Sequence, residues 1–141
     1  MDPVLKAYAI SVVVLYFKTF ATSLVQAASR FSSKTFVNPE DARAFGGVAP
    51  AAQDADGALR GAAVWRNDVE NLPLFMFLGL VYYLVEASPS AAPTYFYTYV
   101  AARIVHSIVF FLGLQPWRFL AFLLGQLCMI GMAVQILMIA M

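Results

Sequence analysis

The last part of the chain, from Phe119 to Met141, contains no charged residue. A helix of about 20 apolar residues is long enough to cross the hydrocarbon core of a bilayer. The composition supports a membrane protein, because 62% of the 141 residues are hydrophobic and only 12% are charged. Soluble domains average about 25% charged residues. The chain is therefore expected to be a small helical membrane protein.

Four segments are predicted to be transmembrane helices. They cover about residues 4–28, 58–85, 94–112 and 118–141. Each combines an apolar stretch of suitable length with flanking polar or turn-forming residues. The predicted fold class is all-α, a polytopic four-helix transmembrane bundle that forms a single domain over residues 1–141.

A long polar connection at about residues 30–60 separates the first two predicted spans. It is rich in turn-forming residues, and a short helix is predicted to begin at Pro39. A connection of this length is unusual in a compact helical bundle, and such loops are commonly functional or disordered.

Lysine and arginine are unevenly distributed over the predicted loops. The first connection and its flanks contain Arg30, Lys34, Arg43, Arg60 and Arg66. The second loop, residues 86–93, has none, and the third turn is followed by Arg118. Because cytoplasmic loops carry the excess of these residues, the first and third loops are expected to be cytoplasmic. The membrane is expected to be a bacterial inner membrane or an organelle membrane such as that of the endoplasmic reticulum.

The composition argues against a nucleic-acid partner, an internal disulfide and a metal site. The net charge is +1 and no basic stripe occurs, so no nucleic-acid partner is expected. Cys128 is the single cysteine and His106 the single histidine, so neither an internal disulfide nor a metal site is expected.

Polar residues open the second predicted helix, in the sequence "RNDVEN" at 66–71. Arg66 and Asn67 precede Glu70 by four and three residues, which places all three on one face of a helix. Ionisable residues at membrane depth are costly and usually face the interior of the bundle or a wet cavity. This face is therefore a candidate site.

The third helix carries a matching polar stripe. Arg103 and His106 are three residues apart, and the helix runs back toward the cytoplasmic side. The two stripes are expected to meet at similar depth, where Arg118 joins them from the third turn. The result is a cationic pocket for a small ligand with two carboxylates and one amine, since arginine binds carboxylates bidentately and Glu70 accepts an ammonium. Its apolar walls would admit a lipid-soluble second substrate.

Each of these residues also has a purely structural interpretation. Arg66 and Glu70 would form a salt bridge at the mouth of a helix, and His106 would be a packed hydrogen-bonding residue. Arg118 would be a topology anchor near the headgroups. Lys18, in the first span, would extend its amine to the interface. Convergence of the polar residues at one depth favours the site.

Three segments of the sequence resemble a known family. They are "FVNPEDARAFGG" (36–47), "RNDVENLPLF" (66–75) and "ARIVHSIVFF" (102–111). They resemble the membrane-associated proteins in eicosanoid and glutathione metabolism, nearest to the branch of microsomal glutathione transferases and microsomal prostaglandin E synthases. The resemblance extends from Lys18 into the fourth span. It implies a four-helix membrane fold, a homotrimer, and glutathione bound between neighbouring subunits near the cytoplasmic face.

The resemblance also assigns roles to residues. The family's glutathione-binding positions correspond to Arg30, Arg66, Asn67, Glu70, Arg103 and His106. Arg118 matches the arginine that faces the glutathione sulfur and is the predicted catalytic residue. Lys18 and Asp41 match further family positions.

Four positions depart from the family pattern. Phe110 and Phe122 stand where relatives have tyrosines, and Phe119 replaces the serine of prostaglandin E synthases. Ala63 occupies a position that is often arginine, for which Arg60 is a possible replacement one turn earlier. The change at Phe119 weakens the isomerase interpretation in particular.

The main hypothesis is a membrane-bound glutathione transferase with a further peroxidase activity to be tested. It would lower the thiol pKa of glutathione, and the thiolate would attack hydrophobic electrophiles or lipid hydroperoxides in a detoxifying reaction. Two alternatives stay open. One is a glutathione-dependent isomerase similar to prostaglandin E synthase, and the other is a non-enzymatic tetraspan scaffold or lipid-binding protein.

Overall fold

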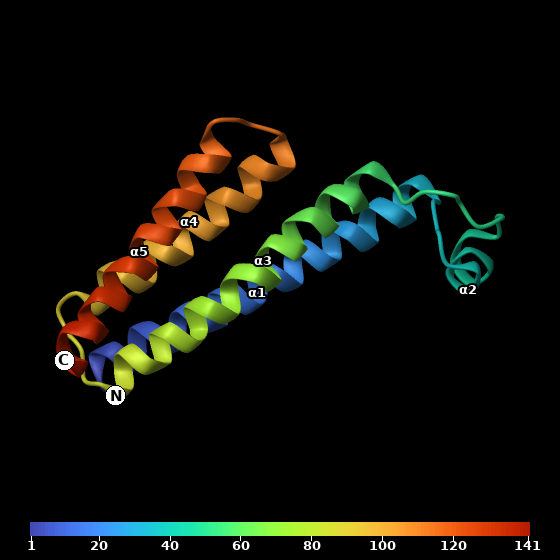
Figure 1. Ribbon diagram of the computed structural model, residues 1–141. Helices are drawn as coiled ribbons and strands as arrows, with labels where there is room; N and C mark the ends of the chain where they lie inside the picture. The colour runs from blue at the N-terminus through green and yellow to red at the C-terminus, as the bar shows by residue number, and fades with distance from the viewer. The chain divides into compact units, whose positions relative to one another are not determined.

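The computed structural model describes residues 1–141 and is entirely helical. Its elements are α1 (Pro3–Ser33), α2 (Pro39–Asp41), the π-helical turn η1 (Ala42–Gly46), α3 (Asp56–Leu84), α4 (Ala92–Leu112) and α5 (Trp117–Ala140) (Figure 1). The all-α class is confirmed, and the short helix predicted from Pro39 is present. Three helices, α1, α4 and α5, are long and apolar enough to cross a membrane.

Helix α3 is not among those three helices. Its first half is polar and includes Asp56, Arg60, Arg66, Asp68 and Glu70. Its apolar part begins at Leu72 and ends at Leu84, which is shorter than the roughly 20 residues of a typical span. Length and composition therefore support three spans, and the predicted count of four depends on α3.

The chain divides into two compact units. The first unit comprises Met1–Lys18 and Val69–Met141, and the second comprises Thr19–Asp68. Helices α1 and α3 each contribute residues to both.

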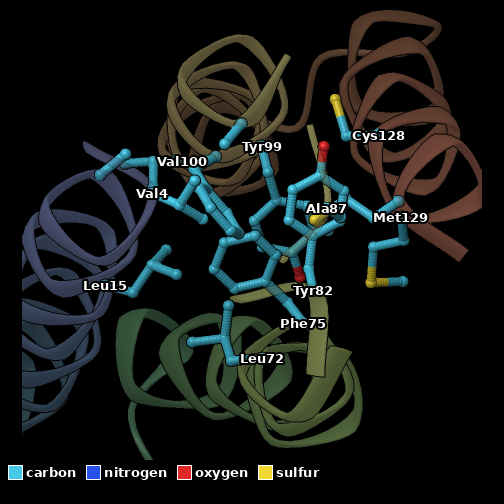
Figure 2. Close-up of a cluster of buried hydrophobic side chains, with 14 residues drawn as sticks. Val4, Leu15, Leu72, Phe75, Tyr82, Ala87, Tyr99, Val100, Cys128 and Met129 are labelled. Carbon is cyan, nitrogen blue, oxygen red and sulfur yellow. The ribbon is translucent and has the colours of Figure 1, made fainter. Parts of the chain in front are cut away.

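The hydrophobic core of the first unit is built from all four long helices. Figure 2 shows Leu15 of α1, Phe75 of α3, Tyr99 of α4 and Met129 of α5 converging on one cluster. The rings of Phe75 and Tyr99 are stacked with their centroids 3.9 Å apart and an interplanar angle of 1°. Within a membrane, such close packing of side chains is a main source of helix association. This core fixes the part of α4 from which the candidate site residues project.

Hydrogen bonds made by side chains, one of them to a main-chain carbonyl, connect the helices of the first unit. The Gln126 side-chain amide donates to Asn71 Oδ1 at 2.9 Å, which connects α5 to α3. The Tyr99 hydroxyl donates to the Asn71 carbonyl at 3.2 Å, which connects α4 to α3. Because hydrocarbon offers no hydrogen-bonding partner, polar groups within a membrane bundle bond to one another.

The turn between α4 and α5 brings Arg118 to its position. Helix α4 ends at Gly113, whose φ of 70° is left-handed and is adopted by glycine without strain. The Leu114 N–H donates to the Val109 carbonyl at 2.9 Å and closes the helix end. Helices α4 and α5 then lie side by side (Figure 1). The turn thus places Arg118 in the first turn of α5, next to the end of α4.

In the second unit, α1 and α3 approach each other closely through glycines. A Cβ atom at Gly57 would lie 2.5 Å from Ser29 Oγ, and one at Gly61 would collide with the Gln26 side chain. Small residues that allow such an approach are typical of helix contacts in membranes. The glycines therefore set the separation between the end of α1 and the beginning of α3.

An aromatic cluster packs the connection against the end of α1. The ring of Phe31 lies 5.5 Å from the rings of both Phe36 and Phe45, measured between centroids. Phe36 is buried, with 4% of its surface exposed. The connection, residues 34–55, is thus shorter than predicted and is organised by α2, η1 and this cluster.

Candidate functional site

The polar face of α3 is open in the single chain. Arg66 and Glu70 are exposed, and Asn67 is half-buried. Asp68, by contrast, has no exposed surface. A spacing of two residues turns a side chain to a different face of a helix. The helix therefore presents Arg66 and Glu70 outward, while Asp68 points into the protein.

Arg103 and His106 of α4 lie in the interior of the first unit, with 1% and 3% of their surfaces exposed. Helix α5 passes Arg103 at Gly125, where an added Cβ atom would make an ordinary van der Waals contact. A Cβ atom at Gly125 would be 3.8 Å from Arg103 Cδ. The Ser107 hydroxyl donates to the Arg103 carbonyl at 3.1 Å. A buried cation in a membrane protein is costly and usually functional.

One turn further along α4, aromatic rings connect His106 to Arg118. The ring of Phe110 lies 5.8 Å from that of His106, and Phe122 of α5 lies 6.4 Å from His106. The Arg118 guanidinium carbon is 4.6 Å from the centre of the Phe110 ring, which is a cation–π contact. Phe110 therefore contacts both Arg118 and His106.

The second partner of Arg118 is Gln115. The two side chains match when the amide oxygen of Gln115 faces the guanidinium. Oε1 then accepts from Nη2 at 2.7 Å and from Nε at 2.9 Å. Because a guanidinium has donors and no acceptor, this is the orientation in which both groups are satisfied. Arg118 itself is half-buried.

Arg30 is held in a different way. Its Nη2 lies 2.6 Å from Asp54 Oδ2, and its Nε donates to Asp54 Oδ1 at 3.0 Å. The Ala55 N–H also donates to Asp54 Oδ1, at 2.9 Å. The hydrogen bonds from Arg30 hold the pKa of Asp54 below its usual value, although partial burial of the carboxyl acts in the opposite direction. Arg30 thus fastens the connection to the end of α1.

A cavity of about 430 Å³ lies beside this ion pair in the second unit. Arg30, Asn38, Asp41 and Asp54 contribute to its lining. The Asn38 side-chain amide donates to Asp41 Oδ2 at 3.1 Å. Asp41 is half-buried here, and Lys18 is half-buried in α1. Asp41 and Lys18 are the two further residues that match family positions.

The predicted site residues are divided between the two units. Arg30, Arg66 and Asn67 belong to the second unit, whereas Glu70, Arg103, His106 and Arg118 belong to the first. Within the first unit the structure brings together His106 and Arg118, with Arg103 one helical turn from His106. No group of His, Cys, Asp or Glu that could hold a metal ion occurs.

Two residues of interest were not selected from the sequence. Asp68 belongs to the polar segment at residues 66–71, and its complete burial distinguishes it from its neighbours. The signal for this was its spacing of two residues from both Arg66 and Glu70. Gln115 gave no signal, since a glutamine in a turn is usually solvated.

Comparison with known proteins gives consistent matches. A family model described as the MAPEG family matches residues 8–138. Prostaglandin E synthase from Bos taurus is 34% identical over 134 residues, covering 94% of this chain and 87% of that protein. Prostaglandin E synthase from Homo sapiens is 32% identical over 137 residues, with coverages of 96% and 90%. Microsomal glutathione S-transferase 1 from Homo sapiens is 35% identical over 140 residues, also covering 96% and 90%.

Proposed function

Because this chain belongs to the MAPEG family, we propose that it is an integral membrane enzyme that transfers glutathione to hydrophobic electrophiles. The relative that is a microsomal glutathione S-transferase supports the activity. The observation that carries the proposal is the environment of Arg118. This cation lies in the first turn of α5 and contacts an amide oxygen and an aromatic ring, with no carboxylate among these partners.

Arg118 is assigned to thiol activation. A free thiol has a pKa near 8.5, and a cation a few ångströms away lowers the pKa of an acidic group by about 1–3 units. At neutral pH the bound thiol would then lose its proton to solvent and be largely thiolate. The sulfur forms a bond to the electrophilic carbon while the leaving group departs with its electron pair. Arg118 stabilises the negative charge on sulfur before the attack.

The polar residues are assigned to binding the charged groups of the glutathione peptide. Arg66 binds a carboxylate and Glu70 binds the ammonium, with Asn67 beside them. Arg30, Arg103 and His106 are assigned to glutathione binding as well. Exposure of Arg66 and Glu70 in the single chain favours a site completed by a neighbouring subunit. This is the reason for including a homotrimer in the proposal.

The proposal also includes a fourth span. Helix α3 would enter the bilayer with its apolar part and keep its polar half at the cytoplasmic face, which together with α1, α4 and α5 gives a four-helix bundle. The family match runs through both compact units without a break, which favours a single domain over residues 1–141. Surrounding membrane lipids would deliver the hydrophobic or lipid-derived second substrate.

Orientation can be tested by labelling. Single cysteines at Ala51 and Ser90, in a variant without Cys128, are expected to react from opposite sides of the membrane, with Ala51 cytoplasmic. Reaction from the same side would refute the fourth span as well as the proposed orientation, because α3 separates the two positions.

A glutathione-dependent isomerase is the second candidate function. The prostaglandin E synthases among the relatives favour it, at 32% identity for the human protein. The presence of Phe119 next to Arg118 argues against it, since the resemblance places a serine there in prostaglandin E synthases. We therefore rank conjugation first, with reduction of lipid hydroperoxides as a companion reaction.

The decisive experiment is a ligand and substrate panel on the purified protein in detergent. Glutathione at about 100 times its dissociation constant should stabilise the fold by roughly 2.7 kcal/mol. A chloro-nitrobenzene, a lipid hydroperoxide and a prostaglandin endoperoxide then distinguish transferase, peroxidase and isomerase. An unchanged melting temperature at millimolar glutathione, together with no turnover, would indicate the non-enzymatic scaffold.

A further inference from the structure

We propose that Gln115 and Phe110 are positioning residues that hold the Arg118 guanidinium through neutral contacts, so that its positive charge remains available to the sulfur of glutathione. The inference rests on the proposed function, in which Arg118 activates the thiol. It assigns a part in catalysis to Gln115, in the turn between α4 and α5, and to Phe110, near the end of α4, both acting on the substrate through Arg118.

The contact with Gln115 fixes one edge of the guanidinium. Oε1 of Gln115 accepts from Nε and Nη2 of Arg118 at 2.9 and 2.7 Å. Paired N–H···O bonds to one edge set the plane of the group as well as its position. The other edge, formed by Nη1 and Nη2, is left for an anion.

Phe110 fixes the guanidinium from a second direction. Its ring centre lies 4.6 Å from Arg118 Cζ. The same ring lies 5.8 Å from that of His106. Because α4 holds Phe110 one turn beyond the buried His106, the ring is a fixed support for the arginine. The guanidinium is thus restrained by an edge contact and a ring contact.

Both partners are uncharged, and this matters for the chemistry. A carboxylate in place of the Gln115 amide would hold Arg118 at least as firmly, because charge-assisted hydrogen bonds are the stronger kind. It would also cancel most of the field that a thiolate experiences. The combination of bidentate restraint and neutrality is what an anion-stabilising arginine needs, and a solvated anchor would need neither.

Gln115→Glu separates these two requirements. The substitution keeps the shape and the hydrogen-bonding edge but adds a negative charge. The titration of bound glutathione, followed by the ultraviolet absorbance of its thiolate, is expected to move upward by about one pH unit or more. Affinity for glutathione should change less than threefold, because the residue does not contact the frame of the ligand. Ser90→Glu, which adds the same charge at the other end of α4, is the matched control and should leave the titration unchanged.

Gln115→Leu and Phe110→Leu test the restraint itself. Each should lower turnover with a chloro-nitrobenzene about tenfold and leave the apparent affinity for glutathione nearly constant. Phe110→Tyr retains the ring and should restore most of the activity lost in Phe110→Leu. Melting temperatures without glutathione identify any variant that fails to fold, and the exposed Gln115 is the position where this risk is smallest.

The outcomes are distinguishable. If the unaltered protein shows a thiolate signal and Gln115→Glu titrates at the same pH, the positioning role is wrong while the proposed function stands. If the unaltered protein binds glutathione without a thiolate signal, thiol activation by Arg118 is wrong and the positioning role is wrong with it. A shift in Gln115→Glu that Ser90→Glu reproduces would also overturn the inference, since it would be a general effect of charge.

Discussion

Arg30 and Arg118 are both half-buried arginines at the ends of long helices, and the protein holds them by the same edge. In each case Nε and Nη2 are bonded to one side chain. The partner of Arg30 is the carboxylate of Asp54, whereas the partner of Arg118 is the amide oxygen of Gln115. The two arginines therefore have similar restraint and very different net charge in their surroundings.

Their places along the helices sharpen this difference. Arg30 is in the last turn of α1, where the partial negative charge of the helix end favours a cation. Arg118 is in the first turn of α5, whose end carries partial positive charge and disfavours a cation. An arginine at an unfavourable helix end without a carboxylate partner is consistent with the anion-binding role proposed for Arg118. The position and the partner of Arg30 both favour stability, so its charge is less available to a ligand.

The largest expected effect follows from removing the available charge. Arg118→Ala, with glutathione still bound, should abolish the thiolate absorbance near neutral pH and lower conjugation about 100-fold or more, equivalent to about 2.7 kcal/mol. Arg43→Ala removes an exposed arginine of η1 and serves as the control. A fully active Arg118→Ala enzyme would remove this residue from the mechanism and eliminate the contrast with Arg30.

The next effect concerns affinity. Arg66 resembles Arg118 in being available, because its side chain is exposed. Arg66→Ala and Glu70→Gln should each weaken glutathione binding about tenfold, or about 1.4 kcal/mol. Arg30→Ala should weaken it less, about threefold, because Asp54 already offsets its charge. Calorimetric titration of glutathione into the three variants ranks their affinities. Equal losses for Arg66→Ala and Arg30→Ala would show that an ion pair with a carboxylate does not reduce the contribution of an arginine to glutathione binding.

A smaller effect is expected from adding a phenol beside Arg118. Phe110→Tyr preserves the ring contact and offers an additional hydrogen-bond donor to the thiolate. Because charge-assisted bonds from Arg118 already stabilise the sulfur, turnover should change within about tenfold, or about 1.4 kcal/mol. Steady-state rates with the same electrophile measure it. A much larger gain would mean that Arg118 alone leaves the thiolate poorly stabilised.

The smallest effect is structural and depends on pH. The folded-state pKa of Asp54 is lowered by Arg30, so its stabilising contribution is complete above the unfolded value of about 3.9 and is lost as the pH falls through the folded value. Asp54→Asn should cost less than about 1 kcal/mol at neutral pH, because the pair is partly exposed. Melting temperatures between neutral and acid pH should show a weaker acid dependence in the variant. An identical dependence would mean that the ion pair adds nothing to stability.

The sequence predicts the helices well, and its errors in their bounds have local causes. Apolar runs and helix-breaking residues locate α1, α3, α4 and α5 to within a few residues, apart from the end of α1. That helix continues to Ser33, and in its last turn the hydroxyls of Ser32 and Ser33 donate to the Ser29 carbonyl at 3.0 and 2.8 Å. Such side-chain bonds to the backbone are not visible in hydropathy. The fourth span is the part of the fold that remains a prediction.

The residues of the candidate site stay a prediction, and their surroundings could not be predicted from the sequence. Helical spacing groups Arg66 with Glu70 and Arg103 with His106, but it does not say that the first pair is exposed and the second buried. That difference depends on which helix covers which face. The partners of the two arginines could not be predicted from the sequence either. Asp54 lies in a connection of irregular backbone, and Gln115 lies in the turn just before Arg118.

The glycines that bring α1 and α3 together also determine what the connection between them can tolerate. The close contact of α1 and α3 at Gly57 and Gly61 holds the two ends of residues 34–55 near each other. The packing of these two helices therefore offsets most of the entropic cost of closing the loop. Each doubling of loop length then adds only about 0.6 kcal/mol. Insertions between η1 and Asp54 should therefore be accepted readily, whereas a single alanine at Gly61 should not. On this basis the connection is the place where length can vary during evolution while the helical frame stays constant.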